Sequence, residues 1–180
     1  IKDRIINYTN SCEAQCNFCA FHAKAGSIEP YKLSVEEILH KITELADAGG
    51  SQVMLQGGLD PEIPFAFFPE LIAEIKKSFP KIYLHSFSPA EINYFSIKEQ
   101  KPIDEIITIL QNAGLDSIPG ASDLLVQEIR STVCQHKISV EEWCNVIKSI
   151  HKHNMHSTAT MTYGFGETNA QKIKHLEVIR

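Results

Sequence analysis

The residues best suited to chemistry are three cysteines that lie close together near the start of the chain. Cys12, Cys16 and Cys19 have the spacing C-x3-C-x2-C. Cysteine thiolates are soft ligands that favour iron–sulfur clusters or zinc, and a structural zinc ion takes four protein ligands. Three thiolates can hold three irons of a [4Fe–4S] cluster and leave the fourth iron open to a small molecule. The spacing therefore predicts a [4Fe–4S] cluster with one open iron.

A zinc site is the alternative. His22 lies three residues after Cys19 and could complete a Cys3His site. Short-spaced zinc sites usually pair two cysteines with a second, distant pair of ligands, and the sequence contains no such pair. Cys134 and Cys144 lie far from the motif and are interpreted as ordinary thiols. A non-catalytic iron–sulfur carrier would need four cysteine ligands, whereas a zinc-stabilised binding module would be colourless.

The elements that must position this motif alternate regularly between strand and helix. Short apolar runs predict five strands, and apolar residues at helical spacing predict the helices. Two helices begin with a capping box, formed by Ser34 with Glu37 and by Ser139 with Glu142. The predicted strands are residues 5–10, 51–56, 82–88, 115–118 and 157–163, and the predicted helices are residues 34–48, 65–78, 103–113, 122–131, 139–154 and a segment after Thr168.

This βα repeat predicts an α/β fold, because right-handed crossovers build a parallel sheet with helices outside it. A doubly wound sheet and a partial TIM-type barrel both fit the pattern. Residues 1–180 are expected to form one domain. The chain opens at Ile1 without Met and ends at Arg180 inside a helical segment, so it is interpreted as the N-terminal part of a longer barrel.

Strand alternation predicts a polar inner face. Val53, Leu55 and Leu84 would face the helices, since helices need an apolar partner. The alternate positions would face a lumen that holds a polar ligand. They are Gln52, Gln56, Tyr83, His85, Thr158, Thr160 and Thr162, and Phe87 shares the face of Tyr83 and His85. A polar core with satisfied hydrogen bonds is the alternative for any one of these side chains.

The cysteine motif, with Phe18 as an aromatic residue before Cys19, resembles the motif of the radical S-adenosylmethionine (SAM) superfamily. The resemblance implies a full or partial TIM-type barrel. It also implies two cofactors, a [4Fe–4S] cluster held by the three cysteines and SAM bound to the open iron through its amino and carboxylate groups. In that superfamily an electron from the cluster cleaves SAM to methionine and a 5′-deoxyadenosyl radical.

The resemblance also implies which residues contact SAM. Phe18 would lie near the adenine. The turn Gln56-Gly57-Gly58 matches a glycine-rich turn that serves the methionine amino group, although Gly-Gly after a strand is often only a turn. Gly164 and Glu167 belong to a segment, residues 163–168, that would pack near the adenine. Ser88 is the remaining SAM-binding candidate.

Over its whole length the chain resembles the branch of the superfamily that makes menaquinone and deazaflavin precursors. Within this branch, residues 117–120 (SIPG) and 165–168 (FGET) are most similar to the dehypoxanthine futalosine cyclases. Aminofutalosine synthase and the FO synthase subunit that joins tyrosine to a pyrimidine are the alternatives. Asp123 departs from the branch, which usually carries a glutamate there. His85, which could orient substrate or move a proton, and Asp116, which could bind a hydroxyl, are the catalytic candidates.

The composition excludes some other classes. The 180 residues carry a net charge of −5 without a basic run, which argues against a nucleic-acid-binding surface. No apolar stretch is long enough to cross a membrane, and no signal-peptide pattern opens the chain. We therefore expect a cytoplasmic protein with no membrane partner and a small-molecule substrate. The resemblance adds an external electron donor such as flavodoxin or ferredoxin.

Overall fold

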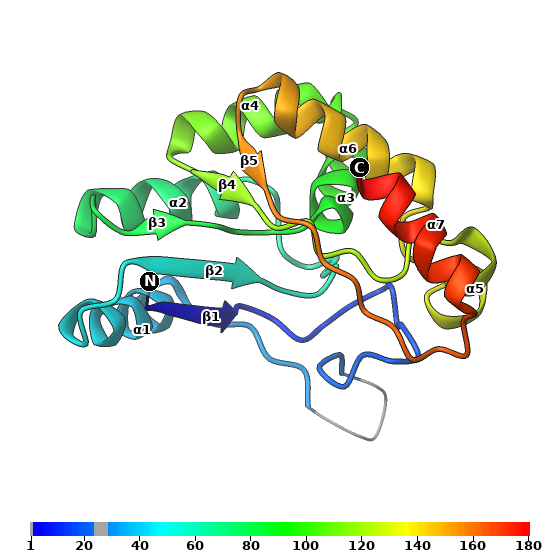
Figure 1. The fold of residues 1–180 in the computed structure, drawn as a ribbon. Helices are drawn as coiled ribbons and strands as arrows, with labels where there is room; N and C mark the ends of the chain where they lie inside the picture. The colour runs from blue at the N-terminus through cyan, green and yellow to red at the C-terminus, as the bar shows by residue number, and fades with distance from the viewer. Residues whose placement is uncertain (1, 24–28) are drawn as a thin grey trace.

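The computed structural model describes residues 2–23 and 29–180. Its parallel strands follow one another in chain order (Figure 1) and are β1 (Asp3–Asn7), β2 (Gln52–Gln56), β3 (Tyr83–Leu84), β4 (Ser117–Ile118) and β5 (His156–Ser157). Strands β1, β2 and β3 form one sheet, β4 pairs with β5, and a parallel bridge between His85 and Ser117 joins the two groups. The predicted α/β partial TIM-type barrel is confirmed, and the doubly wound alternative is wrong because the strand order never reverses.

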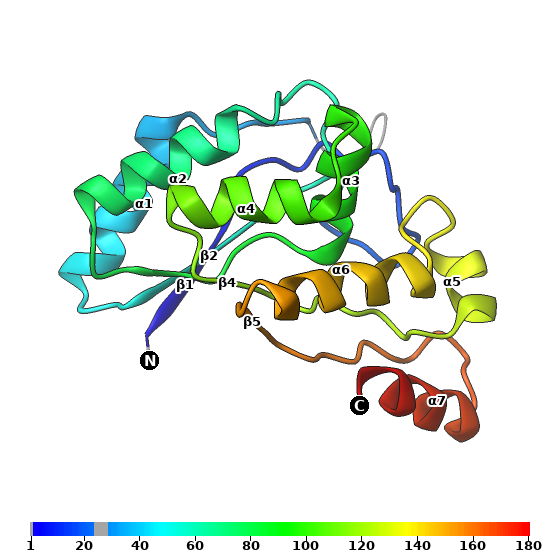
Figure 2. The ribbon, with the colours of Figure 1, turned by 90° about the horizontal axis from the view of Figure 1, so that it is seen from above.

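The helices cover one side of these strands. Helices α2, α4 and α6 contact one another in that order, as Figures 1 and 2 also show. The helices of the described residues are α1 (Val35–Asp47), α2 (Phe67–Ser78), α3 (Pro89–Glu99), α4 (Ile103–Ala113), α5 (Gln127–Val133), α6 (Val140–Lys152) and α7 (Asn169–Ile179).

Local sequence explains where most of these helices begin. Both predicted capping boxes are confirmed, since the Ser34 and Ser139 hydroxyls accept from the amides of Glu37 and Glu142, whose carboxylates reach back to the serine amides. Helix α3 was not predicted. Its residues are buried on more than one side, so they lack the 3.6-residue apolar period on which the prediction rested.

The hydrophobic core lies between the strands and the helices. On β2, Val53 and Leu55 are fully buried, whereas Gln52, Met54 and Gln56 are only partly buried, which confirms the predicted alternation. Leu84 of β3 is also fully buried. The helices contribute Ile38 and Ile42 from α1, Ile72 and Ile75 from α2, and Ile106, Ile107 and Leu110 from α4. This core holds the strands in register, so the loops that follow them have fixed starting points.

The alternation fails after the short third and fifth strands. Phe87 has a left-handed φ of 67°, and its ring packs in the core against Phe68 and Phe95 instead of sharing the face of Tyr83 and His85. Beyond β5, the Thr158 and Thr160 hydroxyls accept from the backbone amides of Gly120 and Ser122. These threonines therefore fix the chain after β4, which was not predicted.

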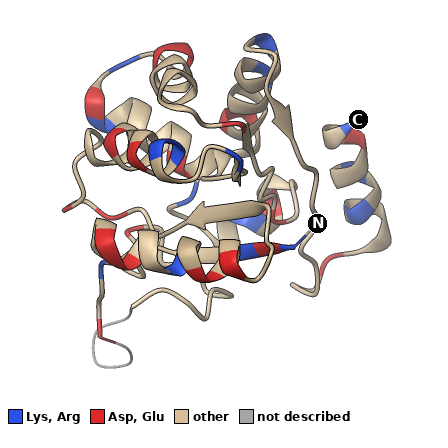
Figure 3. Cartoon of the chain, turned by 90° about the vertical axis from the view of Figure 1, so that its left-hand side faces the viewer, with Lys and Arg blue, Asp and Glu red and all other residues tan. Residues whose placement is uncertain are grey.

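Charge is spread over the surface. In the view of Figure 3, basic and acidic residues are interspersed along the helices. Within residues 2–23 and 29–180, none of the helices is both long and apolar enough to span a membrane.

Candidate functional site

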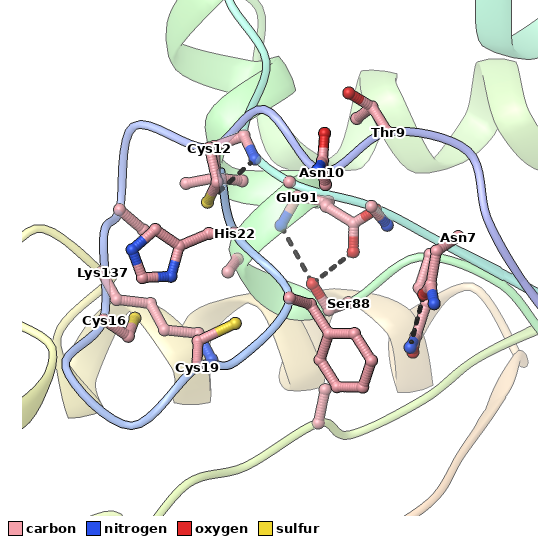
Figure 4. A pocket seen from close by; sticks show the side chains of 18 of the residues that line it. Asn7, Thr9, Asn10, Cys12, Cys16, Cys19, His22, Ser88, Glu91 and Lys137 are labelled. Carbon is pink, nitrogen blue, oxygen red and sulfur yellow. Dashed lines mark hydrogen bonds between the residues drawn. The ribbon is translucent and has the colours of Figure 1, made fainter. Parts of the chain in front are cut away.

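A cavity of about 210 Å³ opens where β1 and β2 end (Figure 4). Cys12, Cys16 and Cys19 all line it, together with Phe18 and His22 from the same loop. The second strand and its turn contribute Gln56, Gly57 and Gly58, and the start of α3 contributes Ser88 and Glu91. The carboxyl ends of parallel strands are where barrel enzymes place their sites, so the location suits a cofactor site.

Backbone hydrogen bonds hold the cysteine loop in place from two sides. On one side the Leu59 amide donates to Cys12 Sγ at 3.3 Å, and the Glu13 amide donates to the Leu59 carbonyl at 3.0 Å. On the other side the Asn17 amide donates to the Val133 carbonyl at 2.8 Å, and the Asn17 side chain donates to the Thr132 carbonyl. The loop is therefore anchored both to the turn after β2 and to the end of α5.

The two glycines after β2 allow this turn and the cysteine loop to pack closely. A Cβ at Gly58 would lie 1.9 Å from the Ser11 carbonyl oxygen and 2.7 Å from Cys12 Cβ. A Cβ at Gly57 would lie 2.5 Å from the Tyr8 ring. The resemblance implied that these glycines belong to a turn that serves the methionine amino group of SAM. They do line the cavity, but the close approach in the structure is to the chain itself, and their contact with SAM remains a prediction.

Glu91 is the main site residue that the sequence analysis missed. Its carboxylate is buried and accepts hydrogen bonds from the Tyr8 hydroxyl at 2.7 Å, the Ser88 hydroxyl at 2.6 Å and the Gly57 amide at 3.2 Å. Burial raises the pKa of Glu91 to about 7. One side chain thus connects the residue that follows β1, the turn after β2 and α3. The Ser-x-x-Glu spacing of Ser88 and Glu91 was a helix-start signal that could have revealed it.

Phe18 and the segment after β5 lie next to each other. The ring of Phe18 packs on that of Phe165 with centroids 5.0 Å apart, so the structure brings Phe165, the residue after Gly164, to the cysteine loop, and the contact of Gly164 with SAM remains a prediction. Glu167 makes local contacts that the sequence did not predict. Its carboxylate accepts from the amides of Gly164 and Phe165, and these hydrogen bonds lower the pKa of Glu167. The carboxylate thus stabilises its own turn, and its contact with SAM remains a prediction.

The two predicted catalytic residues lie outside this cavity. His85 is buried with Nδ1 2.6 Å from Ser117 Oγ, and burial lowers the pKa of His85. Asp116 comes just before β4, at the amino end of the strand. It accepts from Lys76 Nζ at 2.5 Å and from the Leu84 amide at 2.7 Å. The carboxylate ties α2 to β3 on the side away from the cysteines, and the role of Asp116 as a hydroxyl-binding residue remains a prediction.

Of the predicted lumen residues, only Gln56 lines the cavity. Its side-chain Nε2 donates a hydrogen bond to Asn7 Oδ1. Tyr83 and the threonines after β5 are exposed, and none of them reaches the cavity. The expectation that Tyr83, His85, Thr160 and Thr162 share one cavity with Gln56 therefore does not hold.

The cavity suits an iron–sulfur cluster better than a single metal ion. In the described part of the chain, no three His, Cys, Asp or Glu side chains converge as the ligands of one ion would. Three thiols spread around a cavity of this size match a cluster, whose cysteines bind separate irons. The zinc alternative through His22 is not supported by this arrangement, and the cysteines as cluster ligands remain a prediction.

Comparisons with known proteins agree with this geometry. The family model described as "Radical SAM superfamily" matches residues 6–179. The chain is 42% identical to the "Cyclic dehypoxanthine futalosine synthase" of Halalkalibacterium halodurans, over 98% of the chain and 48% of that protein. It is 38% identical to the "5-amino-6-(D-ribitylamino)uracil--L-tyrosine 4-hydroxyphenyl transferase" of Methanothermobacter thermautotrophicus, over 97% of the chain and 48% of that protein. The chain thus spans about half the length of these relatives.

Solved structures show the same fold at low sequence identity. Methylornithine synthase superposes with a TM-score of 0.78 at 18% identity, over 98% of this chain and 49% of that one. HydG, a maturase of the [FeFe]-hydrogenase, gives a TM-score of 0.75 at 13% identity, over 98% and 38% of the two chains.

Proposed function

Because this chain belongs to the radical SAM superfamily, we propose that it is the cofactor-binding part of an enzyme that cyclises dehypoxanthine futalosine in menaquinone biosynthesis. Enzymes of this superfamily use a [4Fe–4S] cluster and SAM and catalyse radical reactions. The observation that carries the choice of reaction is the 42% identity to a cyclic dehypoxanthine futalosine synthase along 98% of the chain.

The side chains around the cavity suggest how the protein would serve this reaction. When bound, the cluster and SAM supply a carbon radical that removes a hydrogen atom from the substrate. Cys12, Cys16 and Cys19 would hold three irons, and the paired rings of Phe18 and Phe165 offer an aromatic surface for the adenine. Glu91 would keep the turn at Gly57 in place beneath the SAM methionine through its hydrogen bond to the Gly57 amide.

A cyclase also has to fold its substrate. Ring closure joins two parts of one molecule, so the protein must hold the ribose and the aromatic ring in contact and keep water away. Holding reacting groups in this way can supply roughly 7–11 kcal/mol at best. An enzyme that joins two separate molecules needs room for the second one as well. The proposal therefore requires that a single substrate, together with SAM, is enough for turnover.

The decisive experiment is an anaerobic assay of the reconstituted full-length enzyme, which contains this chain as its cofactor-binding part, with SAM, a reductant and dehypoxanthine futalosine alone. We expect 5′-deoxyadenosine and the cyclic product, and deuterium at the abstracted ribose position should appear in the 5′-deoxyadenosine. Label retained in the product would contradict the assigned hydrogen abstraction.

The transferase reaction is the second candidate, because a relative with that name is 38% identical to the chain. Turnover with tyrosine and 5-amino-6-(D-ribitylamino)uracil, but none with dehypoxanthine futalosine, would favour it. Turnover with an enolpyruvyl benzoate would favour aminofutalosine synthase instead. For any of these reactions we propose a low-potential electron donor of the flavodoxin or ferredoxin class.

A further inference from the structure

His22 is a buried histidine whose ring has no hydrogen-bond partner among the described residues. The residue is 5% exposed and lines the cavity. Neither Nδ1 nor Nε2 meets a donor or acceptor within residues 2–23 and 29–180. A neutral imidazole carries one N–H donor and one acceptor nitrogen, and burying such groups without a partner costs free energy. The ring is therefore placed for a partner that occupies the cavity.

The other polar groups nearby already have partners. Lys137 Nζ is paired with Asp123 at 2.9 Å. The Asn10 side chain donates to the Glu29 carbonyl and accepts from the Tyr31 amide. The remaining candidate partners on this side of the cavity are the cysteine sulfur atoms and whatever they bind. Figure 4 shows the His22 ring on the side of the cavity that holds Cys12 and Cys16, whereas Ser88 and Glu91 lie on the opposite side.

We propose that His22 donates an N–H hydrogen bond to a sulfur atom of the [4Fe–4S] cluster and thereby tunes its reduction potential. Hydrogen bonds to cluster sulfurs are among the factors that set this potential. Reduction adds negative charge to the cluster, and a hydrogen bond to a charged acceptor is stronger than one to a neutral acceptor. The hydrogen bond from His22 therefore stabilises the reduced cluster. This inference rests on the cluster of the proposed enzyme, but not on the identity of its substrate.

The test compares reconstituted wild-type protein with His22→Phe, which removes the donor, and His22→Gln, which keeps one. Iron and sulfide are measured first, and the cluster is then titrated by electron paramagnetic resonance without SAM. We expect all three proteins to hold the same iron. At the wild-type midpoint potential, the ratio of reduced to oxidised cluster should fall about tenfold in His22→Phe, equivalent to ~59 mV for one electron, and clearly less in His22→Gln.

A matched control is His40→Phe, because the His40 side chain is 76% exposed on α1, far from the cavity. Its potential should equal that of the wild type. A second measurement serves if His22→Phe does not fold. Protein labelled with 15N-histidine should show a weak nitrogen coupling to the reduced cluster in pulsed resonance, and His22→Gln should lose it.

Two outcomes would overturn the inference. The first is an unchanged reduction potential in His22→Phe, and if SAM binding is weakened as well, SAM is the partner of His22. The second is stoichiometric zinc that disappears in His22→Phe, which would make His22 a zinc ligand and would also refute the cluster of the proposed function. If the wild-type enzyme does not turn over dehypoxanthine futalosine but His22→Phe shows the expected shift in potential, only the proposed reaction is refuted.

Discussion

Glu91 is the side chain on which the inner wall of the cavity depends. Its buried carboxylate accepts from a tyrosine of the first strand's loop, a serine at the start of α3 and the amide of Gly57. No arginine, lysine or histidine is among these partners, so burial dominates and the pKa of Glu91 rises to about 7. A carboxyl with a raised pKa favours the folded state only while it stays protonated.

The pH dependence of stability should reveal this carboxyl. Its folded pKa of about 7 lies above the unfolded value near 4.5, so the folded state holds a proton that the unfolded state releases between these values. Its contribution to stability is greatest below the unfolded pKa and is lost as pH rises through the folded pKa. The free energy of unfolding, measured in urea on cluster-free protein, should fall between pH 5 and pH 8 by roughly 2–3 kcal/mol more in the wild type than in Glu91→Gln. Parallel pH profiles would contradict this prediction.

Cys16 and Cys134 form a thiol pair at the edge of the cavity. Hydrogen bonding between them raises the pKa of the Cys16 thiol and lowers that of Cys134 to about 7. Cys134 also lies 3.9 Å from Asp123 Oδ2. A fourth cysteine thus lies beside the motif, and it provides a control for the prediction that only Cys12, Cys16 and Cys19 are cluster ligands.

Replacing Cys12, Cys16 or Cys19 with alanine should reduce iron in the anaerobically reconstituted protein from about four per chain to near zero, because each thiolate holds one iron. Cys134→Ala should keep its iron, although the residue is buried next to Cys16. Iron and sulfide assays decide the point. Loss of iron in Cys134→Ala would make Cys134 a ligand, and zinc in place of iron would refute the cluster.

Among the elements, the turn after β2 and the cysteine loop work as one unit. They share backbone hydrogen bonds at Leu59, and Gly58 lets them touch. The position of Cys12 is thus set by the end of a strand that lies some forty residues further along the chain.

Gly58→Ala should disrupt this unit. The new Cβ would lie 1.9 Å from the Ser11 carbonyl oxygen, a backbone atom that cannot move cheaply. We expect a loss of about 1–3 kcal/mol in the free energy of unfolding and less bound iron. Gly166→Ala is the control, because no atom lies within 4 Å of its Cβ and only its φ of +89° adds strain. That variant should keep its iron, and equal iron loss in both variants would refute the close-packing argument.

The sequence predicted elements well where local signals were strong. The serine–glutamate boxes gave the starts of α1 and α6, and Gly114 marked the end of α4. Helix α3 was missed because residues on nearly all of its faces are buried. Strands β3 and β5 were predicted to be longer than they are, because the backbone leaves the strand conformation before Phe87 and before the threonines that follow β5.

The site was predictable only in its cysteine loop and glycine turn, since those residues are neighbours in sequence. The contacts of Asp116 with Lys76 and of Tyr8 with Glu91 join positions 40 and 83 residues apart. No local period or spacing encodes contacts of that kind, so the ion pair of Asp116 was not foreseen and the role of Glu91 was missed.

At the scale of the whole 180-residue chain, the helices differ in how firmly they are packed against the core. Helices α2 and α4 bury several large apolar side chains completely, whereas α7 leaves Ile173 and Leu176 about half exposed and buries only His175. The ring of His175 accepts from the Leu125 amide and lies 3.0 Å from the Thr160 carbonyl oxygen, and Val178 and Ile179 pack, partly buried, against the cluster around Leu125; these contacts hold α7 to the rest.

Hydrogen exchange of the 180-residue chain should follow this difference. Amides in α7 should exchange at least about tenfold faster than those in α2 and α4, because a helix with few buried contacts opens locally at lower free energy. Mass spectrometry of peptides from each helix measures the rates. The variant His175→Ala should speed exchange in α7 further while leaving α4 unchanged, and equal protection of α7 and α4 would contradict the prediction.

The hydrogen bonds from Asn17 to residues 132–133 can form only after both segments have been synthesised, so the cysteine loop cannot be anchored until late in translation of this chain. The Asn17 side chain and the Thr132 carbonyl are 115 residues apart in the chain. A ribosome adds about 5–20 residues per second, so the cysteine loop emerges on the order of 10 s before the segment that anchors it. During that interval its three thiols belong to an unanchored nascent chain, open to oxidants and competing metals. We therefore expect the cluster to be inserted into the anchored loop only after translation has passed residue 133.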